Sequence, residues 1–383
     1  MHFSKFASKF AVAALALALS ITGCGKKDEA GGAVIKIGSV APLTGPQTHI
    51  GKDNENGARL AVDEINAKGL ELGGKKVKLE LLGEDDQAEP KTATIVAQKL
   101  VDAGVVAVIG HLNSGTTIPA SRIYFDAGIP QISPSATAVA YTAQGYKTAY
   151  RVMANDAQQG KALGQFAVSK MGAKKIAIID DRTAYGQGLA DEFEKAAKAA
   201  GGAVVAREFT NDKANDFTAI LTSIKGKSPD LVFFGGMDPQ GGPMVKQMRG
   251  LGLTARFLGG DGMQNINFMK LAAADAEGVV ASSPGLPIDA MPGGPEFRKR
   301  YEAKYGAIQL YAPYAYDAVN VLVAAMKRAG SAEPAKVLAE LPKTDLQGIS
   351  GPIKFDAKGD TSGGAVTLYE VKGGKWRMLE TVK

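Results

Sequence analysis

The chain has very few of the residues that build disulfides and catalytic triads. Its 383 residues include one cysteine, Cys24, and three histidines, at positions 2, 49 and 111. After Cys24 no cysteine remains to form a disulfide, so stability has to come from apolar burial. The sequence beyond residue 24 also lacks a long apolar run, so no later segment is predicted to cross a bilayer.

The one cysteine ends a segment with the features of a bacterial export signal. Lys5 and Lys9 precede the apolar stretch Phe10 to Leu19, and Ile21-Thr22-Gly23-Cys24 follows at once. This apolar stretch is too short to span a bilayer, which favours a signal over an anchor helix. The last four residues resemble a lipobox, which predicts a signal peptide over residues 1–23 and a diacylglycerol on the Cys24 thiol. The alternative is a free thiol, or an ordinary signal with a cysteine nearby by chance.

This signal predicts a lipid-anchored protein in the periplasm or on the outer face of the cell membrane, where ATP- and NAD-dependent chemistry is disfavoured. Residues 24–33 are polar and rich in glycine, which predicts a flexible tether between lipid and domain. The formal net charge is +6 without a basic block, which argues against nucleic-acid binding. The remaining length is too great for one small core and predicts two lobes.

Short apolar runs alternate with helical segments from Val34 to about residue 280, which is typical of parallel α/β architecture. The alternation occurs in two series, 34–133 and 175–281, and therefore predicts two Rossmann-like, doubly wound lobes. After residue 284 the pattern becomes helical, and three short strands near the end suggest that the chain returns to each lobe. Strands are predicted at Val34–Val40, Val105–Gly110, Lys175–Asp180, Asp230–Gly235, Ala255–Leu258, Ile353–Phe355, Ala365–Tyr369 and Trp376–Leu379.

Ligands of open α/β sheets bind beyond the carboxyl ends of the strands, and polar residues follow several predicted strands. Ser114 and Ser135 precede predicted helices, whose N-terminal N–H groups suit a carboxylate. Asp261 follows another strand and would suit an ammonium group. Hydroxyls on one wall and an acid on the other match a zwitterionic amino acid. Simple helix capping by these hydroxyl residues is the alternative.

Several motifs then resemble, in order, the branched-chain amino-acid-binding proteins of bacterial ABC importers, the leucine/isoleucine/valine type. The resemblance covers nearly the whole chain after the signal, and no single motif decides it. The motifs are Ala41-Pro42-Leu43-Thr44-Gly45-Pro46, Gly110-His111-Leu112-Asn113-Ser114-Gly115-Thr116-Thr117, Ser133-Pro134-Ser135-Ala136-Thr137, Tyr185-Gly186-Gln187-Gly188, and Gly351-Pro352-Ile353-Lys354-Phe355-Asp356 with Gly359-Asp360.

The resemblance implies a type I periplasmic-binding-protein fold, with two lobes joined by three crossover segments that close on an amino acid. It implies lobe 1 over 34–153 plus 284–348, and lobe 2 over 154–283 plus 349–383. By position, Ser114 and Thr137 match residues that hold the ligand carboxylate, and Ser135 and Ala136 match backbone contacts. Thr137 also matches a position near the ammonium. Tyr185 matches a cleft tyrosine, and Asp261 matches the acid that takes the ammonium group.

Three positions depart from the family pattern. Ile50 and Met237 stand where aromatic residues are common on the wall that contacts the ligand side chain. Ordinary packing within a lobe is the alternative role for both. Asp261 is one methylene shorter than the usual glutamate. The two apolar replacements reshape this wall but still favour an aliphatic ligand.

The sequence therefore predicts a solute-binding protein that delivers a branched-chain or related aliphatic amino acid to an ABC permease and its ATPase. A monomer without cofactor or metal is expected, and no enzyme activity. A clamshell subunit that senses its ligand, or a binder of another amino acid, a small amide or urea, remains an alternative. A hydrolase using His111 and Ser114 lacks a nucleophile elbow and an orienting acid. The acidic run Glu84-Asp85-Asp86 matches no calcium loop, and a solvated loop is expected there.

Overall fold

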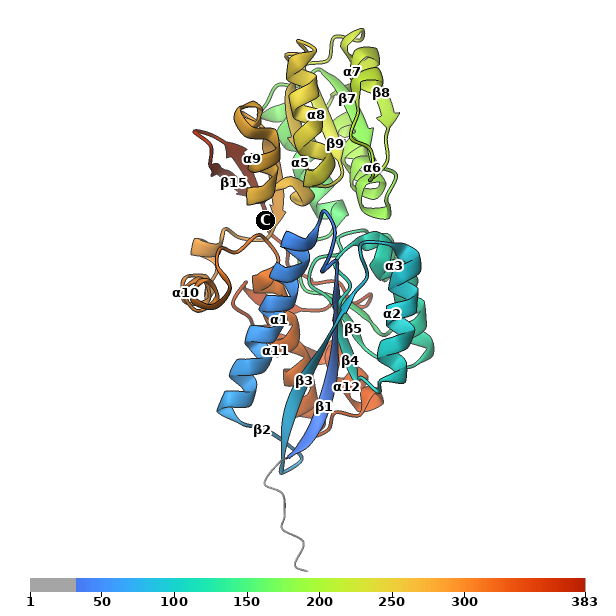
Figure 1. Ribbon diagram of the computed structural model, residues 1–383, viewed down its shortest axis with the longest axis vertical. Helices are drawn as coiled ribbons and strands as arrows, with labels where there is room; N and C mark the ends of the chain where they lie inside the picture. The colour runs from blue at the N-terminus through green and yellow to red at the C-terminus, as the bar shows by residue number, and fades with distance from the viewer. Residues whose placement is uncertain (1–31, 383) are drawn as a thin grey trace, which may run out of the picture.

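The computed structural model describes residues 32–382, which form two α/β halves placed end to end (Figure 1). The predicted signal segment, Cys24 and nearly all of the predicted tether lie outside the described residues. Within residues 32–382, no helix is long and apolar enough to cross a membrane.

The first half is built on a six-stranded sheet in the order β2-β3-β1-β4-β5-β6. All neighbouring pairs are parallel except β2 and β3, which form an antiparallel hairpin. Val40 and Val108 face α2 and α3 on one side of the sheet, whereas Ile37 and Ile109 face α1 and α11 on the other. The strands are β1 Ala33–Ala41, β2 Leu70–Leu72, β3 Lys75–Asp85, β4 Ala107–Gly110, β5 Gln131–Ser133 and β6 Ala149–Arg151; the helices are α1 Thr48–Lys68, α2 Pro90–Asp102, α3 Ser114–Asp126 and α11 Ala312–Ala329.

The second half is built on a seven-stranded sheet in the order β15-β14-β11-β10-β9-β7-β8. Its last two strands along the chain, β14 and β15, are antiparallel to their neighbours. Apolar clusters place α5 and α6 on one face and α7, α8 and α9 on the other. The strands are β7 Lys175–Asp180, β8 Ala203–Phe209, β9 Leu231–Gly235, β10 Arg256–Gly259, β11 Val280–Pro284, β14 Val366–Val371 and β15 Trp376–Val382; the helices are α5 Asp156–Ser169, α6 Ala184–Ala199, α7 Thr218–Lys225, α8 Asp238–Gly250 and α9 Ile266–Ala272.

Local sequence explains how several of these elements begin and end. Pro90 and Pro313 each occupy a first helical turn, where the missing N–H costs no hydrogen bond. Asn155 caps α5 through its side chain and forms a capping box with Gln158. The helix α11 ends at Gly330, whose φ of 60° is left-handed and suits glycine. The inner strands β4 and β9 are apolar along their whole length, and β7 is apolar between Lys175 and Asp180, because helices cover both faces.

The predicted fold class and the strands named from the sequence are confirmed, with end shifts of one to three residues. The hairpin of β2 and β3 was not predicted, because its lysine-rich edge lacks an apolar run. A small antiparallel pair, β12 Asp345–Gln347 and β13 Pro352–Lys354, completes the strands of the described chain. The remaining helices of the described chain are α4 Ala140–Ala143, α10 Gly294–Tyr305 and α12 Pro334–Glu340, together with the 3-10 helices η1 Asp261–Met263, η2 Ala273–Ala276, η3 Ile288–Ala290 and η4 Leu341–Lys343.

The chain passes between the two sheets three times: after β6, after β11 and before β14. In the third passage Asp360 forms a parallel bridge with Arg151 of β6. This bridge associates residues 352–360 with the first sheet, so we propose that the second lobe resumes near residue 361 rather than at 349. The other lobe boundaries given above remain a prediction.

Candidate ligand-binding cleft

The polar residues predicted from the sequence follow strands whose carboxyl ends meet between the two halves. The loops after β4 and β5 come from the first sheet, and those after β7, β9 and β10 come from the second. In each sheet these strands are parallel neighbours, so their following loops gather at one edge. The site therefore lies where the two lobes face each other.

Two serines form the wall contributed by the first sheet. Ser114 is the first residue of α3, where backbone N–H groups have no partner inside the helix. Its hydroxyl accepts a hydrogen bond from the Ala138 N–H at 3.1 Å. Ser135 donates to the Leu112 carbonyl at 3.1 Å and accepts from the Asn54 side chain at the same distance. Both serines are buried, and their hydrogen bonds fix the loop after β5 against the helix start.

The rest of that loop is fixed by a buried arginine. One guanidinium nitrogen of Arg151 donates to the carbonyls of Ala136 at 2.8 Å and Ala138 at 2.9 Å. The Ala136 N–H donates to the Ser133 hydroxyl at 2.9 Å, so both backbone groups of Ala136 are already hydrogen-bonded. The hydroxyl of Thr137, in contrast, is buried without a hydrogen-bond partner. Of these two residues, Thr137 therefore keeps a side-chain hydroxyl, near the Asp156 carboxylate, that the loop itself does not use.

Asp261 forms the opposing wall and is held by two tyrosines. Tyr185 donates to one carboxylate oxygen and Tyr311 to the other, each at 2.8 Å. The Gly262 N–H donates to the Tyr185 hydroxyl at 2.9 Å, which orients that hydroxyl. Tyr185 belongs to the second sheet's half and Tyr311 precedes α11 of the first, so Asp261 is bound from both lobes.

A second buried acid lies close to Asp261. Asp156 begins α5, is fully buried, and has no hydrogen-bond partner at either carboxylate oxygen. Its backbone N–H donates to the Thr137 carbonyl at 2.9 Å, which places it beside the loop after β5. Among the described residues, no lysine, arginine or histidine lies within ion-pair distance of Asp156 or Asp261.

Burial raises the pKa of Asp261 above its ordinary value, although the hydrogen bonds from Tyr311 and Tyr185 oppose this. Burial also raises the pKa of Asp156, well above the ordinary value, and the nearby charge of Asp261 raises it further. Two carboxyl groups in one dry site repel each other when both are ionised. The pair therefore creates a strongly favourable position for a cation.

Of the remaining two predicted site residues, Met237 lines a cavity in the cleft and Ile50 does not. Met237 lines a small cavity of about 10 Å³ at the centre of the cleft, whereas Ile50 is buried in the apolar core without lining it. A larger cavity of about 380 Å³ lies next to it and opens the cleft outward. The small cavity is lined by Leu112, Asn113, Ser114, Ser135, Tyr185, Met237 and Tyr311, of which Asn113, Tyr185 and Met237 also line the larger one.

Asp156 and Tyr311 are the residues of this cleft that sequence reasoning did not identify. Asp156 follows a helix cap, so its sequence context indicates only a helix start. Tyr311 directly precedes α11 and follows no predicted strand, so only the packing of α11 brings it to the cleft.

Both ring nitrogens of His111 are hydrogen-bonded to other buried side chains. Its ring is buried between the Asp86 carboxylate at 2.9 Å and the Tyr124 hydroxyl at 3.0 Å. Its ring thus joins the end of β4 to Asp86, which follows β3, and to Tyr124 of α3. The expectation of a solvated loop at 84–86 is wrong, because Glu84 and Asp85 are the last residues of β3 and Asp86 is buried against this ring. Within residues 32–382, no cluster of three metal-ligating side chains occurs.

Comparison with known proteins agrees with this geometry. A family model described as periplasmic binding protein matches residues 34–375. The chain belongs to the periplasmic binding protein family. It is 35% identical over 343 residues to the Leu/Ile/Val-binding protein BraC3 of Rhizobium johnstonii, covering 89% of this chain and 92% of that one. The Leu-, Ile-, Val-, Thr- and Ala-binding protein of Pseudomonas aeruginosa is 35% identical, with coverage of 88% and 89%.

Solved periplasmic binding proteins have the same fold. The leucine-binding protein LivK of Thermotoga maritima superimposes with a TM-score of 0.85 at 29% identity, over 91% of this chain and 98% of that one. The branched-chain amino acid transporter substrate-binding protein LivJ of Streptococcus pneumoniae, solved with isoleucine, gives 0.83 at 32% identity, over 91% and 99%. The predicted resemblance to this type of binding protein is confirmed.

Proposed function

We propose that this protein is the extracytoplasmic solute-binding component of an ABC importer and that it captures a branched-chain or related aliphatic amino acid. One arrangement carries the ligand class: Tyr185 and Tyr311, which donate to the buried Asp261 carboxylate, line the same small cavity as Ser114 at the start of α3. A second buried acid, Asp156, lies near Asp261. The acids suit an ammonium group, and the helix start with Ser114 and Thr137 suits a carboxylate. The named ligands of the two relatives and of the LivJ structure support an aliphatic side chain.

The wall around the ligand side chain supports the same class. Met237 and Leu112 line the central cavity with apolar atoms, and Tyr311 adds an aromatic face. A cavity of about 10 Å³ accommodates roughly one water, so an amino acid enters only when the lobes separate. Ligand contacts to both lobes then stabilise the closed state. Ser114 and Thr137 act from the first lobe, and Tyr185 and Asp261 act from the second.

The proposed role in an ABC importer also implies a membrane partner, an oligomeric state and a location for this protein. Closed, loaded protein would dock on a permease that works with an ATPase, and the binding protein would act as a monomer. Attachment of lipid at Cys24 would hold it at a membrane surface in the periplasm or outside the cell. These parts rest on the motif around Cys24 and on the family, whose members are periplasmic binding proteins.

Thermal unfolding of the protein without residues 1–23 against single amino acids tests the function. A true ligand at about one hundred times its dissociation constant adds roughly 2.7 kcal/mol to the free energy of unfolding. Leucine, isoleucine and valine should stabilise the protein, whereas glutamate and lysine should not. Absence of stabilisation by every aliphatic amino acid would refute the proposal.

The site is tested by calorimetry on Asp261→Ala, which should weaken leucine binding by about 2–5 kcal/mol because the ammonium loses a buried partner. Asp230→Ala is a suitable control, since Asp230 precedes β9 at the end of the sheet away from the cleft and binds only the backbone of residues 174 and 175. Near-normal affinity in Asp261→Ala would mean that the ammonium is held elsewhere.

A further inference from the structure

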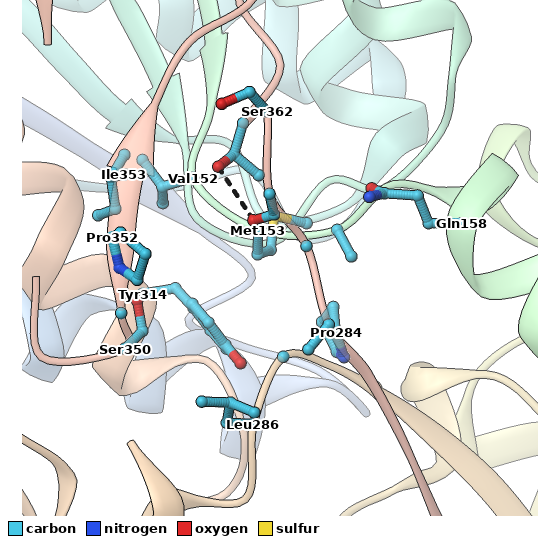
Figure 2. Close-up of a pocket in the computed structure, with 17 residues that line it drawn as sticks. Val152, Met153, Gln158, Pro284, Leu286, Tyr314, Ser350, Pro352, Ile353 and Ser362 are labelled. Carbon is cyan, nitrogen blue, oxygen red and sulfur yellow. Dashed lines mark hydrogen bonds between the residues drawn. The ribbon is translucent and has the colours of Figure 1, made fainter. Parts of the chain in front are cut away.

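A second cavity, separate from the amino-acid cleft, lies where the chain passes between the lobes (Figure 2). Its volume is about 430 Å³, and it shares no lining residue with the central cavity of the cleft. Residues 152–154 of the first passage, 284–286 of the second, and 350–353 with 361–365 of the third all line it. We call it the hinge pocket. Of the five cavities compared within residues 32–382, the hinge pocket is the one lined by residues of all three passages.

The chemistry of the hinge pocket excludes ions as favoured occupants. None of its 17 lining residues is Asp, Glu, Lys, Arg or His. Val152, Met153, Leu286 and Ile353 supply apolar surface around it. A charged molecule would lose hydration there without gaining a partner charge, whereas a largely apolar molecule gains from burial.

One polar group of the hinge pocket is left without a partner. Tyr314 of α11 is 3% exposed, and its hydroxyl makes no hydrogen bond. Figure 2 shows its ring reaching from one wall toward the segment of Pro284 and Leu286. A Cβ atom at Gly285 would lie 2.1 Å from this hydroxyl, so the glycine permits the close approach. Burial raises the pKa of Tyr314, so the hydroxyl keeps its proton and can donate to an oxygen acceptor.

The position of the pocket links its occupant to lobe movement. When lobes rotate about their connections, segments from different connections shift relative to one another. A molecule that touches all three therefore makes different contacts in the open and closed states. Differential contact of this kind is what allows one ligand to change the affinity of another.

We propose that the hinge pocket binds a small uncharged, largely apolar molecule with one hydrogen-bond-accepting oxygen, such as a ketone, and that this occupant changes the affinity of the cleft for its amino acid. Binding of this molecule in the hinge pocket does not depend on the proposed function. Its effect on amino-acid affinity does depend on it, because that effect requires the lobes to close around an amino acid.

The test uses 4-fluoroacetophenone, an uncharged ketone whose fluorine NMR signal reports binding to the protein without residues 1–23. The signal should broaden with the native protein, while 4-fluorobenzoate, its charged counterpart, should show no pocket binding. Titration of leucine separates the two cavities: for a probe in the hinge pocket the apparent dissociation constant reaches a plateau once leucine saturates the cleft. For a probe in the cleft the constant instead rises in proportion to leucine, and that result overturns the proposal. Absence of any ketone binding also overturns it.

Three variants locate the probe. Gly363→Phe should abolish ketone binding, because Gly363 lines the pocket, a Cβ atom there meets no atom within 4 Å, and the ring would take up space in the pocket. Gly250→Phe is the matched control, since Gly250 ends α8 with equally open space and lies outside the pocket. Tyr314→Phe should weaken ketone binding about two- to tenfold through loss of one hydrogen bond. Equal binding to the Gly363 and Gly250 variants would refute the site.

The coupling is measured as the dissociation constant of leucine with and without saturating ketone. A change of about fivefold or more is expected, with the same factor in the affinity for the ketone when leucine is present. An unchanged leucine constant overturns the coupling. Failure of leucine to bind in the absence of ketone would instead contradict the proposed function, while the ketone titration would still decide the pocket.

Discussion

Two N–H groups of the Arg151 side chain donate to a single carboxylate oxygen of Asp360, Nε at 2.9 Å and Nη2 at 2.6 Å. Arg151 ends the last strand before the first passage between the lobes, and Asp360 lies in the third passage. The same guanidinium binds the carbonyls of Ala136 and Ala138. This one pair therefore joins two of the three connections to the loop that carries Thr137.

Removal of one member of this pair should be strongly destabilising. Arg151→Met leaves Asp360 without its cation and is expected to lower the free energy of unfolding by about 3–5 kcal/mol. Asp360 retains 13% exposure, so water offsets part of the loss and favours the lower end. Urea unfolding gives the value. The double variant Arg151→Met with Asp360→Asn should cost less than the sum of the single changes, and strict additivity would contradict a direct interaction.

Asp53 of α1 holds the backbone segment that carries Tyr311. Its buried carboxylate accepts backbone N–H groups of Gln309, Leu310, Tyr311 and Ala312 at 2.8–3.0 Å. Asp53→Ala should lower the free energy of unfolding by at least about 2 kcal/mol, because several buried donors lose their acceptor. Asp53→Asn keeps one acceptor oxygen and should lose less.

Asp53→Ala should also reduce leucine affinity, since Asp53 holds the backbone of Tyr311 and Tyr311 orients Asp261. Tyr311→Phe provides the comparison: it should weaken leucine binding with a smaller loss of stability. Chemical denaturation and calorimetry on the three variants separate the two effects. Wild-type affinity in Asp53→Ala would show that the backbone of residues 309–312 holds its position without this acid.

Leucine binding should release protons in a defined range of pH. Burial raises the pKa of Asp156 and Asp261, so the free protein holds a proton above the ordinary carboxyl value of 3.8. A bound ammonium favours the ionised acids and lowers both pKa values. Between the lowered and raised values, binding expels a proton and affinity increases with pH; above the raised values the dependence ends.

Calorimetry in two buffers of different ionisation enthalpy, from about pH 5 to 8, counts the protons released. Asp156→Asn should abolish most of this release. The same raised pKa values favour the folded protein at low pH, and this contribution to stability is lost as pH rises through the folded-state values. A proton count of zero across the whole range, with pH-independent affinity, would show that the acids are already ionised without ligand.

The sequence predicted the fold well because its signals were local. The strand β9 is apolar along its length, the inner residues of β7 are apolar, and Pro90 marks the start of α2. The motifs that suggested the family were also continuous along the chain. Asp156 and Tyr311 escaped notice because their proximity to Asp261 arises only when distant segments pack together. The roles assigned to the individual site residues, Ile50 included, remain predictions.

The repeated crossing of the chain has a consequence for biosynthesis. Helix α11 covers one face of the first sheet, yet it is made after the whole middle of the second, and β14 and β15 follow it. A nascent chain that ends before residue 312 thus exposes apolar surface on its first sheet. The first sheet gains α11 only after residue 312 and the second gains β14 and β15 only after residue 366, so both halves remain incomplete for most of translation.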